Sequence, residues 1–236
     1  MRDRRRRWRA YGDLVLGSPG LVGYWRLGER SGTVASDEMG ANHGTYVAAP
    51  TLAAVGLLAG DADTAVTLNG STQRVTVLAV PANLKPATVT FAAWVSPSVV
   101  DDTLNFVGGL GTTGVVGWYL HMHNTAGFRF TVGNGSATAN TASSGVPVVG
   151  TTYFVAGTFD GATIRCYINA ALVGSGTALA GPIGYTGVND LHIGSLQGNT
   201  GMAARYFPGT IDEVAIWPRA LTAAEISHLY RVGRGY

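Results

Sequence analysis

Apolar and polar residues alternate along much of the chain after residue 21. The clearest run is Trp118–His123 (WYLHMH), in which Trp, Leu and Met alternate with Tyr and two His. A period of two places these sets on opposite faces of a β-strand. Turns rich in Gly, Asn, Asp and Pro separate such runs, a pattern typical of an antiparallel sandwich or barrel. Strands are predicted at residues 21–27, 65–68, 74–78, 87–95, 118–123, 128–132, 153–159, 164–168 and 191–193.

One helix is predicted, at the C-terminal end of the chain. Thr222 and Glu225 have the spacing of a capping box, in which each side chain accepts a hydrogen bond from the other residue's amide. Ile226 and Leu229 begin an apolar stripe at helical spacing, and Gly233 is a suitable stop. The predicted fold class is therefore all-β, an antiparallel β-sandwich with one short C-terminal helix.

Charge is scarce and unevenly distributed. Charged residues make up 13% of the chain, against roughly 25% in an average soluble domain. Residues 1–20 are predicted to be a basic N-terminal arm and lead-in, and residues 21–236 the folded domain. Like charges disfavour folding of the arm alone, so we expect it to bind a partner. The residues expected to make that contact are Arg2, Arg4, Arg5, Arg6, Arg7, Trp8 and Arg9.

Targeting signals are missing from the sequence pattern. The single cysteine excludes an internal disulfide, and no apolar run is long enough to predict a membrane span. The basic start lacks the apolar stretch of a secretory signal, because Asp13 and residues 17–20 interrupt it. We therefore expect synthesis in a host cytoplasm without a signal peptide. The body has no nucleic-acid-binding motif, so a nucleic-acid partner is not expected.

Six blocks of sequence, in order, resemble laminin-G-like (concanavalin-A-like) jelly-roll domains. The blocks are Tyr24–Glu29 with the loop from Asp37 to Tyr46, Leu68–Ser71 with Val75, Thr90–Val95, Phe154–Gly161, Tyr167–Asn169 and Phe207–Leu221. The resemblance covers about residues 21–232 and implies two curved antiparallel sheets packed face to face. It departs from the family at Asn169-Ala170, where the central hairpin usually has Asn-Gly. Because Ala is costly at positive φ, we expect a longer turn or another turn type there.

The resemblance also implies a structural calcium ion. Such domains often hold Ca²⁺ between the opening loop and the late Ile-Asp-Glu strand. The matching positions are Asp37, Asn42 and Asp212, with the backbone carbonyl of Gly44. Calcium binds six to eight oxygen ligands, which carboxylates, amides, carbonyls and water can supply. The alternative is that Asp37 and Asn42 cap turns through hydrogen bonds to the backbone.

Catalytic patterns are not evident. A retaining glucanase needs two carboxylates about 5 Å apart across the sugar bond, and none of the four Glu belongs to a Glu-x-Asp-x-x-Glu pattern. Asp212 and Glu213 are adjacent, so a regular strand would point them to opposite faces. Cys166 alternates with Ile164 and Ile168, which predicts a buried, inert thiol. We therefore expect a non-enzymatic protein.

A row of polar residues on one strand face is the candidate ligand site. Tyr119, His121 and His123 share a face, and Arg129 points outward from the next predicted strand. These four residues are the candidate glycan-binding set. The two His could instead bind a metal ion with a third ligand from elsewhere, His43 or His192. The third interpretation is a pair of exposed polar residues on a solvent face.

A virion structural protein, either a phage capsid decoration protein or a minor tail protein, is the expected function. The chain resembles lectin-like domains and has no evident catalytic pattern. Its arm could attach it to other virion proteins. Contact with a cell-surface glycan and homo-oligomer formation in the assembly are also expected. The alternatives are a carbohydrate-binding module, that is, a lectin, or a bacterial surface adhesion domain.

Overall fold

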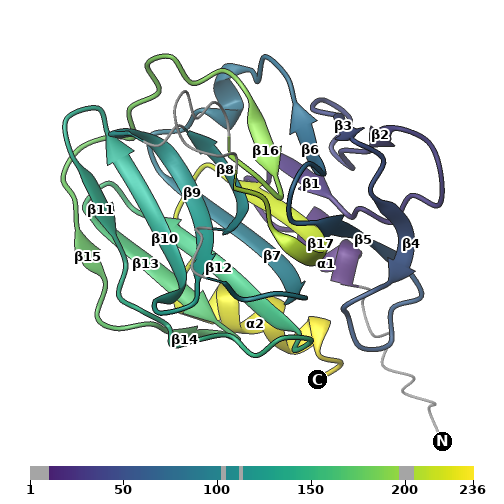
Figure 1. Ribbon diagram of the computed structural model, residues 1–236. Helices are drawn as coiled ribbons and strands as arrows, with labels where there is room; N and C mark the ends of the chain where they lie inside the picture. Colours follow the sequence, from purple (N-terminus) through teal and green to yellow (C-terminus); the bar gives the residue numbers. More distant parts are fainter. Residues whose placement is uncertain (1–10, 102–104, 112–113, 197–204) are drawn as a thin grey trace, which may run out of the picture.

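The computed structural model describes residues 11–101, 105–111, 114–196 and 205–236. Within these ranges the chain forms two antiparallel sheets packed face to face, with a helix near each end (Figure 1). The predicted antiparallel β-sandwich is thus confirmed. The basic arm and its candidate contacts between Arg2 and Arg9 lie outside the described residues.

One sheet has nine strands and is built around β17, which pairs with β5, β7 and β1. In the order β14-β13-β12-β7-β17-β5-β4, its strands are Ala171–Leu172, Thr163–Ile168, Tyr153–Phe159, Val89–Pro97, Pro208–Trp217, Thr64–Asn69 and Thr51–Val55. The remaining strands are β1, Gly23–Trp25, and β15, Thr177–Ala178, which pairs with β13.

The other sheet has eight strands, and β8, β9 and β10 form its most extensively paired part. In the order β11-β10-β9-β8-β16-β6-β3-β2, its strands are Thr138–Asn140, Gly127–Asn134, Val116–His123, Asn105–Gly111, Leu191–Ile193, Arg74–Val77, Gly44–Val47 and Val34–Ala35. A short 3₁₀ turn, Ala82–Leu84, precedes β7. Each predicted strand run thus contains or overlaps a strand of the structure.

The main core lies between the two sheets. Side chains at every second position of β7 and β9 point into it, as the alternation predicted, and each fully buried aromatic ring contributes about 1.5–3 kcal/mol. Cys166 is fully buried in the same core, which confirms the predicted buried thiol. Burial raises its pKa to about 12, so the thiol stays protonated. The core members that fix these two strands are Val89, Phe91, Ala93, Val95, Trp118, Leu120 and Met122.

A second apolar cluster covers the outer face of the nine-stranded sheet. Helices α1 (Tyr11–Leu16) and α2 (Ala223–Gly233) pack there against the outward side chains of β7, β12 and β17. The Trp94 ring stacks on Tyr230 of α2 with centroids 6.0 Å apart, and Tyr11 of α1 meets Trp94 edge-on at 6.2 Å. Tyr11 and Val15 are buried in this cluster, so α1 is part of the packed domain.

The predicted capping box at α2 is confirmed. Thr222 accepts a hydrogen bond from the Glu225 amide, and Glu225 accepts one from the Thr222 amide. Arg219 also holds the Glu225 carboxylate, with an N···O distance of 2.6 Å. The hydrogen bond from Arg219 lowers the pKa of Glu225 to about 2. Across the described ranges, the helices are too short and too polar to span a bilayer.

The turn between β13 and β14 differs from the prediction. Only Asn169 and Ala170 separate the strands, and both have positive φ, 51° and 68°. The expectation of a longer or different turn was therefore wrong, because the hairpin keeps the two-residue left-handed geometry that Asn-Gly adopts. Asn169 is fixed to β12 by two hydrogen bonds with the Phe154 backbone, of 2.8 and 2.9 Å. These bonds set the register, so Ala170 takes up the strained conformation.

Candidate functional site

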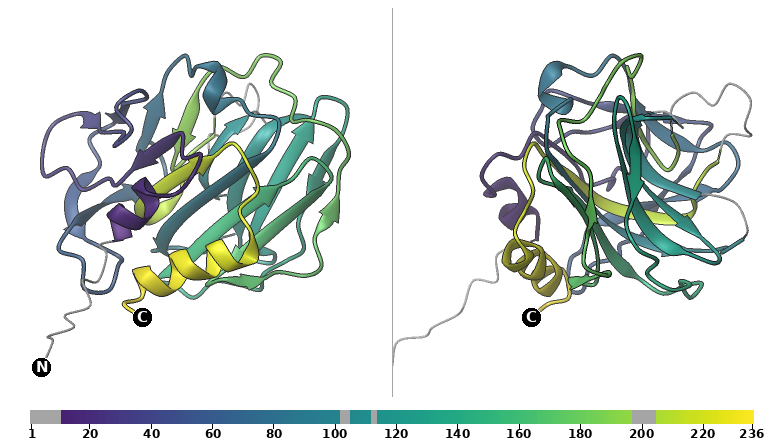
Figure 2. Two further views of the ribbon diagram at one scale, coloured as in Figure 1. Left: turned by 180° about the vertical axis from the view of Figure 1, so that it is seen from behind. Right: turned by 90° about the vertical axis from the view of Figure 1, so that its left-hand side faces the viewer.

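The outer face of the eight-stranded sheet is the face without a described helix, since both helices lie against the other sheet (Figure 2). In this sheet His121 lies opposite Arg129 across the β9–β10 pair. Leu120 and Phe130, their neighbours in sequence, point into the core. Alternation therefore turns His121, His123 and Arg129 outward, as predicted. Three of the four candidate glycan-binding residues thus project from one face of two adjacent strands.

A hollow lies between these side chains and the loop that joins β9 to β10. Its volume is about 320 Å³, at the lower end of the about 300–1,000 Å³ typical of ligand pockets. We call it the β9–β10 hollow. The described residues that line it are His121, His123, Thr125, Ala126, Arg129 and Ser143. Thr125, Ala126 and Ser143 come from loops, where no periodic signal exists to identify them from sequence.

His121 is the buried member of the hollow, with 5% of its surface exposed. The interpretation of both His residues as exposed is therefore wrong for His121. Its Nε2 lies 3.2 Å from Thr131 Oγ1, and that hydroxyl donates its proton to Asn140 Oδ1 at 2.5 Å. Because the Thr131 hydroxyl donates its hydrogen bond to Asn140, it can only accept one from His121. The imidazole proton is therefore on Nε2, which donates a hydrogen bond to Thr131 Oγ1. Burial, followed by the charge of Arg129, lowers the pKa of His121 to about 4.

Two buried nitrogens at the hollow have no hydrogen-bond partner: His121 Nδ1 and Arg129 Nε. With the proton on Nε2, His121 Nδ1 is an acceptor, whereas the Arg129 Nε–H is a donor. A buried polar atom that lacks a partner costs about 1–3 kcal/mol. At the edge of a hollow, a ligand or a water molecule can supply the missing partner. The hollow therefore offers one acceptor and one cationic donor side by side.

Tyr119, the fourth candidate residue, lies beside the hollow and is not among its described lining residues. Its ring centroid is 5.5 Å from that of His121 and 5.3 Å from that of Phe106. Phe106, in β8, is fully buried on this same face and lies opposite His121 in the strand register. The two aromatic rings thus pack against His121 and restrict the orientation of its imidazole. Sequence reasoning missed Phe106.

The alternative of a histidine metal site has no third ligand among the candidates. His43 Nδ1 accepts a hydrogen bond from the Asp37 amide at 3.0 Å, and His192 Nδ1 lies 2.9 Å from Ser195 Oγ. Both candidates are therefore engaged away from the hollow. Over the part of the chain that the structure describes, no group of three His, Cys, Asp or Glu side chains could hold a metal ion.

Asp37 and Asn42, two of the predicted calcium ligands, lie together in one loop. The Asp37 carboxylate accepts hydrogen bonds of 2.9–3.3 Å from the amides of Tyr24, Met39, Ala41 and Asn42 and from the Asn42 side chain. Asp37 thus caps the loop, as the alternative interpretation expected. Asn42 Oδ1 is buried and has no partner, so it is the oxygen at which the loop could accept a cation. Gly44 begins β3, two residues later.

Asp212, the remaining predicted ligand, contacts a different segment. Its Oδ2 accepts a hydrogen bond from the Leu57 amide at 2.8 Å, and its Oδ1 is buried without a partner. Burial and the charge of Glu213 raise its pKa well above the usual range. One carboxylate and one amide at the Asp37 loop supply few of the six to eight oxygens that calcium takes. The residues described here do not fit a site shared by Asp37 and Asp212.

A β-bulge changes the expected geometry of Asp212 and Glu213. The pairing of β17 with β7 shifts register between Asp212 and Ala215, and Glu213 has a φ of 54°. The alternation therefore breaks, and both carboxylates face the side that carries α1 and the loop around Leu57. The prediction that they point to opposite faces was wrong, because it assumed a regular strand.

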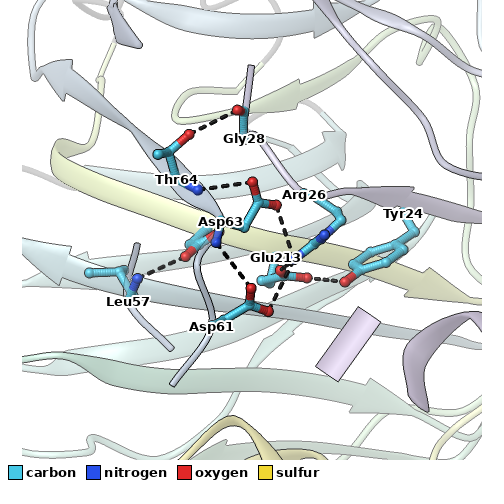
Figure 3. Close-up of polar contacts among 9 residues, drawn as sticks. Tyr24, Arg26, Gly28, Leu57, Asp61, Asp63, Thr64 and Glu213 are labelled. Atoms are coloured by element: carbon cyan, nitrogen blue, oxygen red, sulfur yellow. Dashed lines mark hydrogen bonds and ion pairs between the residues drawn. The ribbon is translucent and has the colours of Figure 1, made fainter. Parts of the chain in front are cut away.

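Glu213 is buried inside a polar network rather than exposed in a cleft (Figure 3). Tyr24 donates a hydrogen bond to its Oε2, and the Arg26 guanidinium lies 3.0 Å from its Oε1. Arg26 also pairs with Asp61 and Asp63, at 3.1 and 3.0 Å. Burial raises the pKa of Glu213 to about 7, although Tyr24 and Arg26 act in the opposite direction. This network joins β1, the loop before β5 and β17, and only 1% of Glu213 is exposed.

The sequence match agrees with this architecture. Residues 69–227 match the family Laminin_G_3, described as the concanavalin A-like lectin/glucanases superfamily. The chain belongs to this superfamily. A search of curated proteins found no match. The resemblance noted in the sequence is thereby confirmed, and the two-sheet sandwich is the fold of the superfamily.

Solved structures share this fold at low sequence identity. Domain 4 of AbnA, a GH43 extracellular arabinanase from Geobacillus stearothermophilus solved with arabinotriose, is 18% identical with a TM-score of 0.67, over 89% of this chain and 98% of that domain. Trypanosoma rangeli sialidase, solved with sialic acid, is 17% identical with a TM-score of 0.66, over 90% of this chain. The binding domain of botulinum neurotoxin DC, in complex with rat synaptotagmin II, is 13% identical with a TM-score of 0.62, over 90% of this chain and 51% of that one.

The coverage of these structures differs. The chain spans about a third of the sialidase, 33% of its length, and half of the neurotoxin domain, but nearly the whole of the arabinanase domain 4. At identities of 13–18% these likenesses show the fold alone. The function of this chain must therefore be argued from its own site.

Proposed function

We propose that this chain is a non-catalytic carbohydrate-binding domain that binds its ligand in the β9–β10 hollow. The observation that carries the proposal is the pair of buried, unpartnered nitrogens, His121 Nδ1 and Arg129 Nε, on the face without a described helix. A sugar can supply a partner to both nitrogens, since its hydroxyls donate and accept hydrogen bonds. The structural neighbours solved with arabinotriose and sialic acid give the proposal further support.

We propose a non-catalytic domain because no suitably placed pair of carboxylates is found among the described residues. Glycosidases of the usual type need two carboxyl groups on either side of an accessible sugar bond. Asp212 and Glu213 are 2% and 1% exposed, and Arg26, Tyr24 and Leu57 already bind them. The described lining of the β9–β10 hollow contains no carboxylate. Sugar hydrolysis would therefore lack its acid and its nucleophile at either place.

A glycan array that includes bacterial wall polysaccharides tests the proposal. We expect the chain to bind specific glycans and His123→Ala to weaken that binding, because His123 lines the hollow. His228→Ala is the matched control, since His228 is an exposed residue of α2 on the other sheet. Equal loss in both variants, or binding unaffected by either, would place the glycan site elsewhere. Hydrolysis products from any bound glycan would contradict the non-catalytic assignment.

A virion is the setting we propose for this binding activity. A capsid decoration protein or minor tail protein needs an attachment device and a surface that meets the host. The basic composition of the N-terminal arm supports the first, and the β9–β10 hollow supports the second. In this setting the chain would be made in the host cytoplasm and would assemble as a homo-oligomer. Mass spectrometry of purified particles tests it, and particles that lack the chain would refute it.

A structural calcium ion at the Asp37 loop is a further part of the proposal. Asn42 Oδ1 supports it as an unpartnered buried oxygen, and backbone carbonyls such as that of Gly44, together with water, would have to supply most of the other ligands. Thermal unfolding in calcium and in chelator is the test. A melting temperature that is the same in both would leave Asp37 as a turn cap alone.

A further inference from the structure

The β9–β10 hollow has a positive electrostatic environment. Arg129 and His123 line it, and no carboxylate lies among its described lining residues. Besides burial, the charges of three groups lower the pKa of His121, and all three are cations when ionised: Arg129, His123 and Arg205. A ligand with negative charge is therefore favoured there over a neutral ligand of the same shape.

Arg129 has the geometry to bind such a charge. Its neighbours Phe128 and Phe130 are anchored in the core, so the position of the side chain on β10 is fixed. Its Nε–H is buried and has no partner. A guanidinium presents Nε–H and a terminal N–H as a planar fork that matches two oxygens of a carboxylate, sulfate or phosphate group. An anionic oxygen would satisfy the donor that the protein leaves unmatched.

His121 supplies a contact of the opposite kind. Its proton lies on Nε2, which donates to Thr131, so Nδ1 can only accept a hydrogen bond. The imidazole is also neutral at neutral pH, because its pKa is lowered to about 4. His121 therefore attracts a hydroxyl donor and leaves the anion to Arg129. An anionic oxygen beside a hydroxyl is the pattern of an acidic sugar.

Building on the function proposed above, we propose that the β9–β10 hollow selects saccharides that carry an anionic group. Arg129 binds the anionic oxygens, and His121 Nδ1 accepts a hydrogen bond from a neighbouring sugar hydroxyl. Uronic acids, sulfated sugars and phosphorylated wall polymers share this chemistry. Neutral saccharides lack the group that the Arg129 fork requires.

Isothermal titration calorimetry of the full chain tests this selectivity with trigalacturonic acid and its methyl ester. The two probes have the same rings and hydroxyls and differ in charge. We expect the acid to bind at least about tenfold more tightly, which is about 1.4 kcal/mol, and this advantage to decrease with added salt. Sulfated galactose oligosaccharide, compared with its desulfated form, separates sulfate recognition from carboxylate recognition. A preference for the charged member of either pair supports the proposal.

Variants assign the selectivity to a residue. Arg129→Gln should remove the difference between acid and ester, and Arg129→Lys should keep part of it, because Lys retains the charge without the fork. Arg231→Gln in α2 is the control and should bind as the unmodified chain does, since Arg231 lies on the helix of the other sheet, where its Nε donates to the Ser227 carbonyl. Circular dichroism and thermal unfolding verify the fold, and Arg129→Lys alone suffices if Arg129→Gln does not fold.

The two proposals can fail separately. If the uncharged member of each pair binds as tightly as the charged one, the anionic selectivity is overturned and carbohydrate binding stands. Selectivity that persists in Arg129→Gln would overturn the role of Arg129. If neither these probes nor any glycan on the array binds, carbohydrate binding itself is refuted.

Discussion

His121 and Arg129 are register partners in β9 and β10, so their side chains leave the same face of the sheet next to each other. Both carry a buried nitrogen without a partner, and both line one hollow. The pairing of the strands, rather than a loop, thus sets the separation of the two groups. A site on paired strands is held more rigidly than one on loops.

His121 should remain a neutral Nε2–H imidazole well below its usual titration range. Burial and the charge of Arg129 lower its pKa to about 4, and the Thr131 hydroxyl accepts a hydrogen bond from its Nε2–H. Two-dimensional ¹H–¹⁵N NMR of the imidazole nitrogens as a function of pH measures both properties. His228, an exposed residue of α2, serves as the internal comparison. A His121 titration near pH 6.5, or a proton on Nδ1, would contradict the assignment.

Thr131→Val should destabilise the domain by about 1–3 kcal/mol, because it leaves the His121 Nε2–H and Asn140 Oδ1 without their shared hydroxyl. The substitution keeps the shape of the side chain, so little packing is lost. Urea unfolding measures the change, and the same variant should bind glycan more weakly because His121 loses its fixed orientation. Thr177→Val is the comparison, because it removes a hydrogen bond at the surface, from Thr177 Oγ1 to the Asn140 carbonyl, and should cost less stability. Unchanged stability in Thr131→Val would show that the hydrogen-bond chain is not formed.

The faces of the strands could be predicted because alternation is a local property. Trp118, Leu120 and Met122 enter the core, and the outward position of His121 and His123 follows at once. The hollow itself could not be predicted, since Thr125 and Ser143 meet only after β9, β10 and the following loop have folded. The burial of His121 also depends on Phe106, which is brought beside it by pairing of β8 with β9.

Two errors of the sequence interpretation share one cause. The first is the bulge between Asp212 and Ala215, and the second is the strained turn at Ala170. In both places, contacts in the tertiary structure override a rule that depends on local sequence. In the first, the Arg26 network stabilises Glu213 at positive φ. In the second, the hydrogen bonds of Asn169 to Phe154 fix the turn length. Neither partner lies near in sequence, so neither effect is visible in the local pattern.

Glu213→Gln should change how the stability of the domain depends on pH. The folded-state pKa of Glu213 is raised from 4.5 to about 7, so the folded chain holds this proton more tightly than the unfolded chain. Its contribution is fully present below pH 4.5 and is lost as pH rises towards 7, by roughly 3 kcal/mol at most. The Gln variant has no such loss, so its stability relative to the unmodified chain should increase over that window.

The comparison with the variant is needed because other groups titrate in the same range. The lowered pKa values of His121 and His192, each about 4, add stability as pH rises and oppose the effect of Glu213. Urea unfolding of both chains at pH 4.5–8 gives the difference curve, in which the His contributions cancel and the titration of Glu213 remains, together with its coupling to Asp212. Glu225→Gln is the control, since the pKa of Glu225 is lowered to about 2 and its effect lies in more acid solution. A flat difference curve for Glu213→Gln would show a normal pKa.

Ala170→Gly should stabilise the domain by about 1 kcal/mol, although glycine usually destabilises folded chains. Ala170 has a φ of 68°, a conformation that costs an L-residue roughly 1–2 kcal/mol and glycine almost nothing. Part of the gain is offset by the extra freedom of glycine in the unfolded chain and by the loss of a methyl group that packs on the outer cluster. Ala171→Gly, one position later in β14, is the matched control and should destabilise. Thermal unfolding that ranks Ala170→Gly below the unmodified chain would show that methyl packing outweighs the strain of the turn.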